Sequence, residues 1–169
     1  PWMNFSFLHF IKERITENHS ILEFGGGYST LYWAKNVKCV YGIEHDSFFV
    51  ETLRPKMPAN GFLLVPGEKN LLDYEQMGSL AYEHNNSIKF DILIIDGIKR
   101  NECFHESIQY LKGDGIVIWD DSSRVSYLEA FDNLKSMGFK RLAFEGLKPG
   151  DRSIDETSVF YRNNNCLGL

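Results

Sequence analysis

The feature that most constrains the fold is a regular alternation of short apolar runs with segments of helical spacing. The apolar runs predict five buried strands, at residues 20–24 (SILEF), 38–43 (KCVYGI), 62–65 (FLLV), 90–95 (FDILII) and 115–119 (GIVIW). Between them, helices are predicted at residues 30–35, 47–54, 71–83 and 102–111. Because buried strands that alternate with helices usually pair in parallel, this pattern predicts an α/β fold with helices on both faces of one sheet.

The two ends of the chain extend this pattern. Apolar residues recur at helical spacing from Phe5 to Ile15 and predict an opening helix. Another helix is predicted at 127–137, followed by two strands at 141–144 and 158–161. Specificity tends to reside in loops on a rigid scaffold, so the opening helix and the polar loop at 148–156, which joins the last two strands, are both candidate lids.

Polar residues and glycines predict where individual helices start and stop. Ser47 is expected to cap the helix at 47–54. The glycine-containing segment Lys112–Gly115 is expected to end the helix at 102–111. We therefore expect one domain over residues 1–169, with its N-terminal helical segment at 1–18.

Composition and charge exclude several classes of function. The 169 residues carry a net charge of −5, which argues against a nucleic-acid partner, since such partners usually bind a basic face. The chain shows no secretory signal pattern and no apolar run near the roughly 18 residues needed to cross a bilayer. Three widely spaced cysteines form no metal-binding or disulfide pattern. We expect a cytoplasmic protein without a membrane partner.

Acidic residues end four of the predicted strands. Glu23 lies at the end of the first strand, Glu44 follows the second, Asp96 follows the fourth and Asp120-Asp121 follow the fifth. The carboxyl ends of parallel strands meet at one edge of a sheet, where ligands bind in open α/β folds. This repetition predicts a ligand site at that edge.

Three consecutive glycines, Gly25, Gly26 and Gly27, separate the first strand from its helix. Glycine allows a tight turn and lets a ligand approach backbone N–H groups. Glu23, two residues before this loop, disfavours a phosphate dianion and suits the amino group of an aminocarboxylate, while Glu44 is placed to accept ribose hydroxyls.

These features fit either a nicotinamide dinucleotide or S-adenosylmethionine. The dinucleotide fingerprint GxGxxG lacks its last glycine here, because Thr30 stands in that position. No YxxxK pair for hydride chemistry is present. The methyl donor is therefore the favoured ligand.

Five segments resemble the motifs of class I S-adenosylmethionine-dependent methyltransferases, and in particular small bacterial methyltransferase-like proteins. These segments are LEFGGGYST (22–30), VYGIEHD (40–46), FDILIIDGIKRNECF (90–104), GIVIWDDSSRVSY (115–127) and TSVFYR (157–162). The resemblance implies a Rossmann-like, seven-stranded, mostly parallel sheet whose last strand is antiparallel.

The same resemblance implies how the cofactor is held. Glu23 and the glycine loop would bind the methionine part, Glu44 the ribose, and the loop after Val65 the adenine. The complete set of expected cofactor-binding residues is Glu23, Gly25, Gly26, Gly27, Ser29, Thr30, Glu44, His45, Pro66, Gly67 and Asp96.

The spacing Asp96-x-x-Lys99, followed by Asp120-Asp121, is similar to catechol-type O-methyltransferases. That resemblance implies that Asp96, Asp120 and Asp121 hold Mg²⁺ and that Lys99 removes the proton from the acceptor. Asp121 departs from the asparagine of that family and makes the site more negative. Two alternatives remain open: these residues act as acid and base without metal, one carboxyl holding a proton, or the carboxylates only cap the following helices.

The sequence thus predicts a methyltransferase that acts on oxygen of a small molecule or a glycan. Oxygen is favoured because DGIK at 96–99 replaces the (Asn/Asp)-Pro-Pro-(Tyr/Phe) motif of many nitrogen-directed enzymes. One alternative is a catalytically silent S-adenosylmethionine-binding or assembly domain, whose site a partner chain in an oligomer would complete. Another alternative is an NAD(P)-dependent oxidoreductase.

Overall fold

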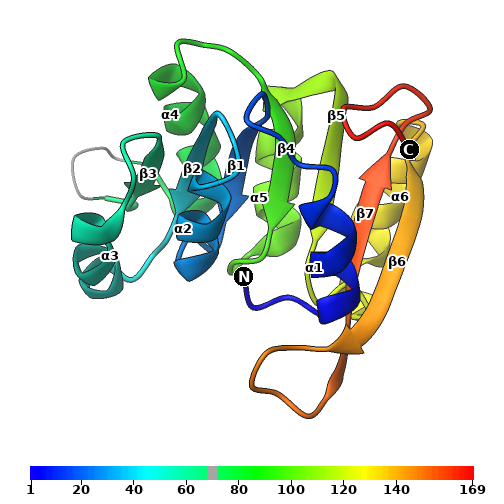
Figure 1. Ribbon diagram of the computed structural model, residues 1–169. Helices are drawn as coiled ribbons and strands as arrows, with labels where there is room; N and C mark the ends of the chain where they lie inside the picture. The colour runs from blue at the N-terminus through cyan, green and yellow to red at the C-terminus, as the bar shows by residue number, and fades with distance from the viewer. Residues whose placement is uncertain (68–71) are drawn as a thin grey trace.

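The computed structural model describes residues 1–67 and 72–169 and contains a seven-stranded sheet within them (Figure 1). The strand order is β3-β2-β1-β4-β5-β7-β6. Strands β1 to β5 pair in parallel, and β7 lies antiparallel to both β5 and β6, which confirms the predicted sheet. The strands are β1 (Ser20–Phe24), β2 (Cys39–Ile43), β3 (Gly61–Leu64), β4 (Phe90–Ile95), β5 (Leu111–Trp119), β6 (Lys140–Leu147) and β7 (Ile154–Tyr161).

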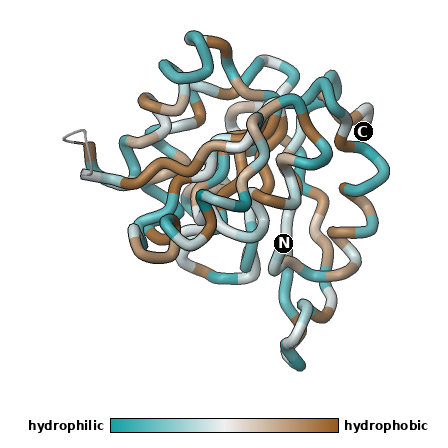
Figure 2. Tube along the Cα trace, turned by 60° about the vertical axis from the view of Figure 1, so that its left-hand side comes forward, coloured by the Kyte–Doolittle hydropathy of each residue, from teal (hydrophilic) through white to brown (hydrophobic). Residues whose placement is uncertain are grey.

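Helices cover both faces of the sheet. The α-helices are α1 (Phe5–Lys12), α2 (Tyr28–Ala34), α3 (Ser47–Leu53), α4 (Met77–His84), α5 (Arg100–Ser107) and α6 (Leu128–Ser136). One apolar layer joins α4, α5 and α6 to the sheet, the opposite layer joins α1 and α2 to it, and α3 packs beside β3 (Figure 1). Figure 2 shows hydrophobic segments of the chain running through the middle of the molecule.

Because side chains alternate between the two faces of the sheet, each central strand contributes apolar residues to both layers. Leu93 and Ile95 of β4 belong to the layer of α4 to α6, whereas Ile92 and Ile94 belong to the layer of α1 and α2. Successive side chains of a strand point to opposite faces, so a continuous apolar run such as FDILII covers both. No helix in residues 1–67 and 72–169 has the length and apolar character needed to cross a membrane.

The opening helix α1 packs into the core of the molecule. Phe7 and Ile11 of α1 are fully buried, and the helix begins at Asn4, whose side chain accepts a hydrogen bond from the Phe7 N–H. The Asn4 amide also donates to the Phe144 carbonyl of β6 at 2.8 Å. The burial of α1 does not support a lid role for the helix itself, and Trp2, in the segment before it, lines the site described below.

The end of α5 differs from the prediction. Lys112–Gly115 forms no glycine stop but lies inside β5, where the register shifts from Phe90↔Leu111 to Ile92↔Ile116. A Cβ on Gly115 would come within 2.7 Å of the Leu111 side chain. Glycine inside a strand commonly marks such a bulge, which local sequence does not distinguish from a helix end.

Three further boundaries differ from prediction. Asp46 caps α3 in place of Ser47, because its side chain accepts from the Phe49 N–H. The predicted helix at 71–83 begins outside the described residues, and its described part contains a 3₁₀ turn at Tyr74–Gln76 followed by α4. The pairing of β6 with β7 continues to Leu147↔Ile154, so the loop between them is shorter than the predicted 148–156.

Candidate functional site

Two adjoining cavities open at the carboxyl ends of the parallel strands. One has a volume of about 410 Å³ and lies beside the glycine loop. The other, of about 400 Å³, lies beside the end of β5 and the β6–β7 loop. Trp2 and Asp96 line both. We call them the glycine-loop cavity and the acidic cavity.

The glycine-loop cavity contains many of the residues predicted to bind the cofactor. Its lining residues are Trp2, Gly25, Gly26, Gly27, Tyr28, Ser29, Glu44, His45, Phe49, Asp96, Gly97 and Ile98. The aromatic and apolar members of this group were not predicted, because isolated apolar residues on helices and loops are usually part of the core.

The glycine loop ties together the ends of three strands. Gly25 and Gly26 both donate to the Ile43 carbonyl of β2 at 2.9 Å, and Asp96 after β4 donates to the Phe24 carbonyl of β1 at 2.9 Å. Gly25 has a φ of +92°, and a Cβ there would lie 2.7 Å from the Asp96 backbone carbon. Glycine is required at this position by the backbone geometry as well as by access to the cavity.

Glu23 does not contact either cavity, contrary to the prediction. Its carboxylate is fully buried, accepts from Thr30 Oγ1 at 2.5 Å and from Trp33 Nε1 at 3.0 Å, and lies under α2. Strand alternation places Glu23 on the face of Ile21, turned away from Phe24. Burial raises the pKa of Glu23 to about 7.

Thr30 is likewise a support of the loop and does not line a cavity. Its buried hydroxyl donates to Glu23 and accepts from the Gly27 N–H at 2.8 Å. Glu23 and Thr30 therefore hold the glycine loop from below, through a chain of hydrogen bonds that ends at the backbone of Gly27.

Glu44 lines the glycine-loop cavity, and one of its two carboxylate oxygens accepts hydrogen bonds from the protein. Glu44 Oε1 accepts from the backbone N–H groups of His45 and Asp46 at 2.8 and 2.9 Å, and lies 2.7 Å from His45 Nδ1. Oε2 accepts no hydrogen bond from any group within the described ranges. The placement of Glu44 agrees with its expected role toward a diol.

Pro66 and Gly67 follow β3, and neither lines the glycine-loop cavity as the described residues form it. Gly67 has a φ of +76°, and a Cβ there would have no neighbour within 4 Å among the residues that the structure describes. The adenine contact expected of these two residues stays a prediction. The rest of that loop, residues 68–71, lies outside the described part of the chain.

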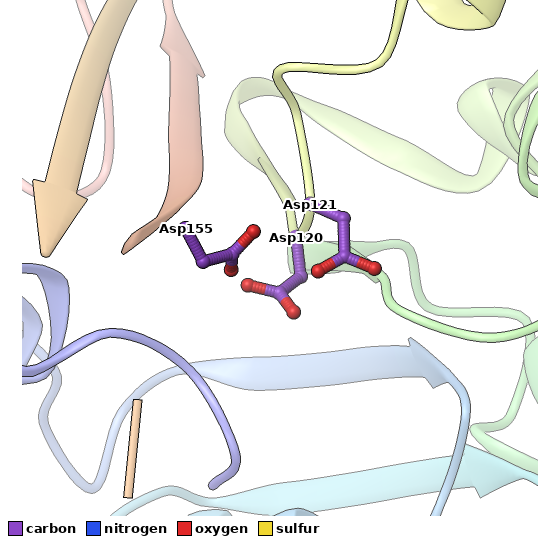
Figure 3. Close-up of side chains that lie close together, drawn as sticks. All are labelled: Asp120, Asp121 and Asp155. Atoms are coloured by element: carbon purple, nitrogen blue, oxygen red, sulfur yellow. The ribbon is translucent and has the colours of Figure 1, made fainter. Parts of the chain in front are cut away.

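The acidic cavity is lined by carboxylates and cations. Its lining residues are Trp2, Asp96, Arg100, Asp120, Asp121, Arg124, Lys148, Asp151, Ser153 and Asp155. Asp120, Asp121 and Asp155 converge there with oxygen atoms that lie within 4.8 Å of one another (Figure 3). Asp155, and not the predicted Asp96, completes this close group.

A lysine ammonium lies among these three carboxylates. Lys148 Nζ is 2.7 Å from an oxygen of each of Asp120, Asp121 and Asp155. Lys148 is 7% exposed. Its role was missed in the sequence, where a single lysine in a polar loop gives no signal of burial.

Asp96 is the acidic residue that both cavities share. Arg100 Nη2 lies 3.2 Å from Asp96 Oδ1 and 3.1 Å from Asp121 Oδ2, so one guanidinium links the two carboxylates. Burial and the neighbouring charge of Asp120 raise the pKa of Asp96 well above its ordinary value, although Arg100 opposes the shift.

Lys99 points away from the cavities, contrary to the prediction that it acts as the base. Its ammonium binds both carboxylate oxygens of Glu75, at 3.1 and 2.9 Å. The hydrogen bond to Glu75 raises the pKa of Lys99 and keeps the amine protonated. Lys99 has a φ of +47° at the start of α5, and this backbone turn was not visible in the local sequence.

Comparisons with known proteins show the fold. No family model matches the chain. No curated protein matches it either. Among solved structures, the O-methyltransferase TomG from Streptomyces achromogenes, involved in tomaymycin synthesis and in complex with SAM, has a TM-score of 0.69 at 16% identity, over 93% of this chain and 78% of that one.

Two other structures give the same result. An O-methyltransferase from Bacillus cereus in complex with SAH has a TM-score of 0.67 at 18% identity, over 93% of this chain and 80% of that one. An rRNA methylase from Streptococcus thermophilus has a TM-score of 0.63 at 16% identity, over 91% and 92% of the two chains. This chain has the Rossmann-like fold of class I methyltransferases.

Proposed function

We propose that this chain is an S-adenosylmethionine-dependent methyltransferase that acts on a hydroxyl oxygen of a small polar molecule or a glycan. The observation that carries the proposal is the meeting of two cavities at Asp96. A donor in the glycine-loop cavity and an acceptor in the acidic cavity would face each other across this residue. Holding both reactants in line is the main contribution of a protein to such a displacement.

The glycine-loop cavity fits the donor. Its volume of about 410 Å³ lies within the range of roughly 300–1,000 Å³ that is usual for ligand pockets. Phe49 and Ile98 offer apolar surface to a flat ring, and Glu44 Oε2 is available to accept ribose hydroxyls. The bound donor supplies an electrophilic methyl group on a sulfonium, whose positive charge the Asp96 carboxylate favours.

The acidic cavity fits a hydroxylated acceptor. It offers several carboxylates together with Arg100 and Arg124, so that a molecule rich in hydroxyl groups can both donate and accept hydrogen bonds. Trp2 adds an exposed aromatic face, which suits the apolar side of a sugar or phenol ring. A polyanion such as nucleic acid is disfavoured by the carboxylates.

Asp96 is the proposed base. A general base works best when its pKa lies near the working pH, because it can then both take up and keep the proton. Burial raises the pKa of Asp96 in that direction. Asp121 is less suitable. Burial alone would raise the pKa of Asp121, but the hydrogen bond from Lys148 and the charges of Arg100 and Arg124 outweigh it and lower the pKa.

Binding and transfer assays on two variants test this proposal. Glu44→Gln is expected to weaken S-adenosylmethionine binding about tenfold in calorimetry, because a charged acceptor of hydroxyl groups is lost. Asp96→Asn is expected to lower kcat about 10²-fold or more, measured as labelled methyl transfer to a panel of sugars, phenols and amines.

Asp114→Asn is the matched control, since Asp114 lies in the β5 bulge at the opposite edge of the sheet. It is expected to leave both donor binding and transfer unchanged. Failure of the folded protein to bind either S-adenosylmethionine or S-adenosylhomocysteine would contradict the proposal. Donor binding without transfer to any acceptor class would favour a silent binding domain.

A further inference from the structure

In the acidic cavity, the carboxylates of Asp120, Asp121 and Asp155 are paired with a cationic side chain of the same chain, Lys148. An ammonium group has three N–H donors and no acceptor. Lys148 donates hydrogen bonds to Asp120 Oδ2 and Asp121 Oδ1 at 2.7 Å, and its Nζ also forms an ion pair with Asp155 Oδ2 at 2.7 Å. The remaining charge on Asp121 is met by Arg100 at 3.1 Å and by Arg124.

Lys148 is held in this position from several sides. Trp2 Nε1 donates to the carbonyl of Pro149 at 2.8 Å, and Lys148 Nζ lies 5.5 Å from the centroid of the Trp2 ring. On the carboxylate side, Thr157 Oγ1 donates to Asp120 Oδ1 at 2.6 Å. Asp120 is 1% exposed, so the pair it forms with Lys148 is removed from solvent. The ammonium is thus a fixed part of the cavity.

The same three carboxylates are oxygen ligands of the kind that hard divalent cations prefer. The ammonium already contacts the oxygens that such an ion would need. A divalent ion placed in the same group would lie within a few ångströms of the ammonium, where the two like charges repel each other strongly even at the effective dielectric constant of about 20 that is usual in proteins. The two cations therefore exclude each other, and the residues present do not fit the magnesium site that the resemblance implied.

We infer that Lys148 is the resident cation of the acidic cavity and takes the place of a divalent metal ion among Asp120, Asp121 and Asp155. The inference concerns the chain's own charges and does not depend on the proposed methyl transfer. Its consequence for that reaction is that Lys148 and Arg100 position the acidic groups around the acceptor, and transfer needs no added metal.

Metal binding to the intact protein and to a charge-deleted variant tests the inference. Lys148→Met keeps the length of the side chain and removes the charge. Lys112→Met is the matched control, because Lys112 also pairs with a carboxylate, Asp91, at 2.7 Å, but at the opposite edge of the sheet. Free Mn²⁺ is measured by electron paramagnetic resonance during titration, which requires neither donor nor acceptor.

We expect the wild-type protein and Lys112→Met to show no saturable Mn²⁺ site. Lys148→Met should bind one Mn²⁺ per chain, at least about tenfold more tightly than the wild type, because the competing charge is gone. Thermal melting checks folding: if Lys148→Met is destabilised, Mn²⁺ should raise its Tm and not that of the control.

Two results would overturn the inference. One is a saturable Mn²⁺ site in the wild type that involves these carboxylates, shown by its loss in Asp155→Asn. The other is a Lys148→Met protein that neither binds Mn²⁺ nor gains thermal stability from it. A separate failure of methyl transfer would contradict the proposed function and leave this inference standing.

Discussion

At the scale of single residues, Glu23 is an ionisable group used for structure. Thr30 and Trp33 donate to its two carboxylate oxygens inside the layer below α2. Thr30 then accepts from the Gly27 N–H, so the Glu23 carboxylate reaches the glycine loop only through another side chain. Glu23 is accordingly a positioning residue.

The buried state of Glu23 predicts a pH-dependent stability. Its pKa rises from 4.5 to about 7 on burial, so the folded chain binds more protons than the unfolded chain between these values. The free energy of unfolding therefore falls as the pH rises from about 4.5 to 7, by on the order of 3 kcal/mol from this group alone. Glu23→Gln should remove that part of the pH dependence in denaturant titrations.

Glu106→Gln is the control for this experiment, since Glu106 is exposed on α5. Its denaturant midpoints should follow those of the wild type at every pH. A Glu23→Gln protein with the same pH dependence as the wild type would show that the burial of Glu23 does not control stability in this range.

At the scale of elements, the conformation of the turn between β1 and α2 is determined by the close approach of the ends of β1, β2 and β4. Gly25 donates to β2 and packs against the backbone after β4. Its positive φ disfavours any residue with a Cβ. The glycine loop, which borders the glycine-loop cavity, therefore also aligns the ends of these strands.

Gly25→Ala is expected to destabilise the chain by at least about 1–3 kcal/mol, because it combines a strained φ with contact against the Asp96 backbone. Denaturant unfolding measures the change. Gly113→Ala is the matched control in β5, where a Cβ meets nothing within 4 Å. Equal stability of the two variants would contradict this account of the turn.

At the scale of the whole molecule, the N-terminal segment meets the β6–β7 loop at the acidic cavity. The segment before α1 carries Trp2, which contacts Lys148 and Pro149 in the β6–β7 loop. The loop is brought beside Asp120 because β7 pairs with β5 and β6 with β7 (Figure 1). Residues from distant parts of the chain thus close one side of the cavity.

Trp2→Ala is expected to loosen this closure without unfolding the chain. Trp2 is 63% exposed, so its removal should change the Tm little, while amide exchange in residues 148–153 becomes faster. The KM for an acceptor should rise about three- to tenfold with loss of the aromatic face. Phe48→Ala is the control, since Phe48 is 80% exposed on α3. Unchanged exchange and KM in Trp2→Ala would contradict the role of Trp2.

The sequence by itself determined the order of strands and helices, the parallel sheet and the edge at which acidic residues gather. These features depend on local apolar periodicity and on the residues at strand ends, which are read from consecutive positions. The glycine loop and Glu44 were predicted in the same way, and both line the same cavity.

Only the tertiary structure decided which side chains face the cavities. Glu23 turns under α2, Lys99 turns toward Glu75, and Lys148 enters the acidic group beside Asp155. The physical reason is that each side-chain orientation depends on a partner distant in sequence or, at Lys99, on a backbone turn with positive φ. Neither can be read from the neighbouring residues in the sequence. Lys148 meets Asp120 only because β7 inserts between β5 and β6, and no local pattern records that contact.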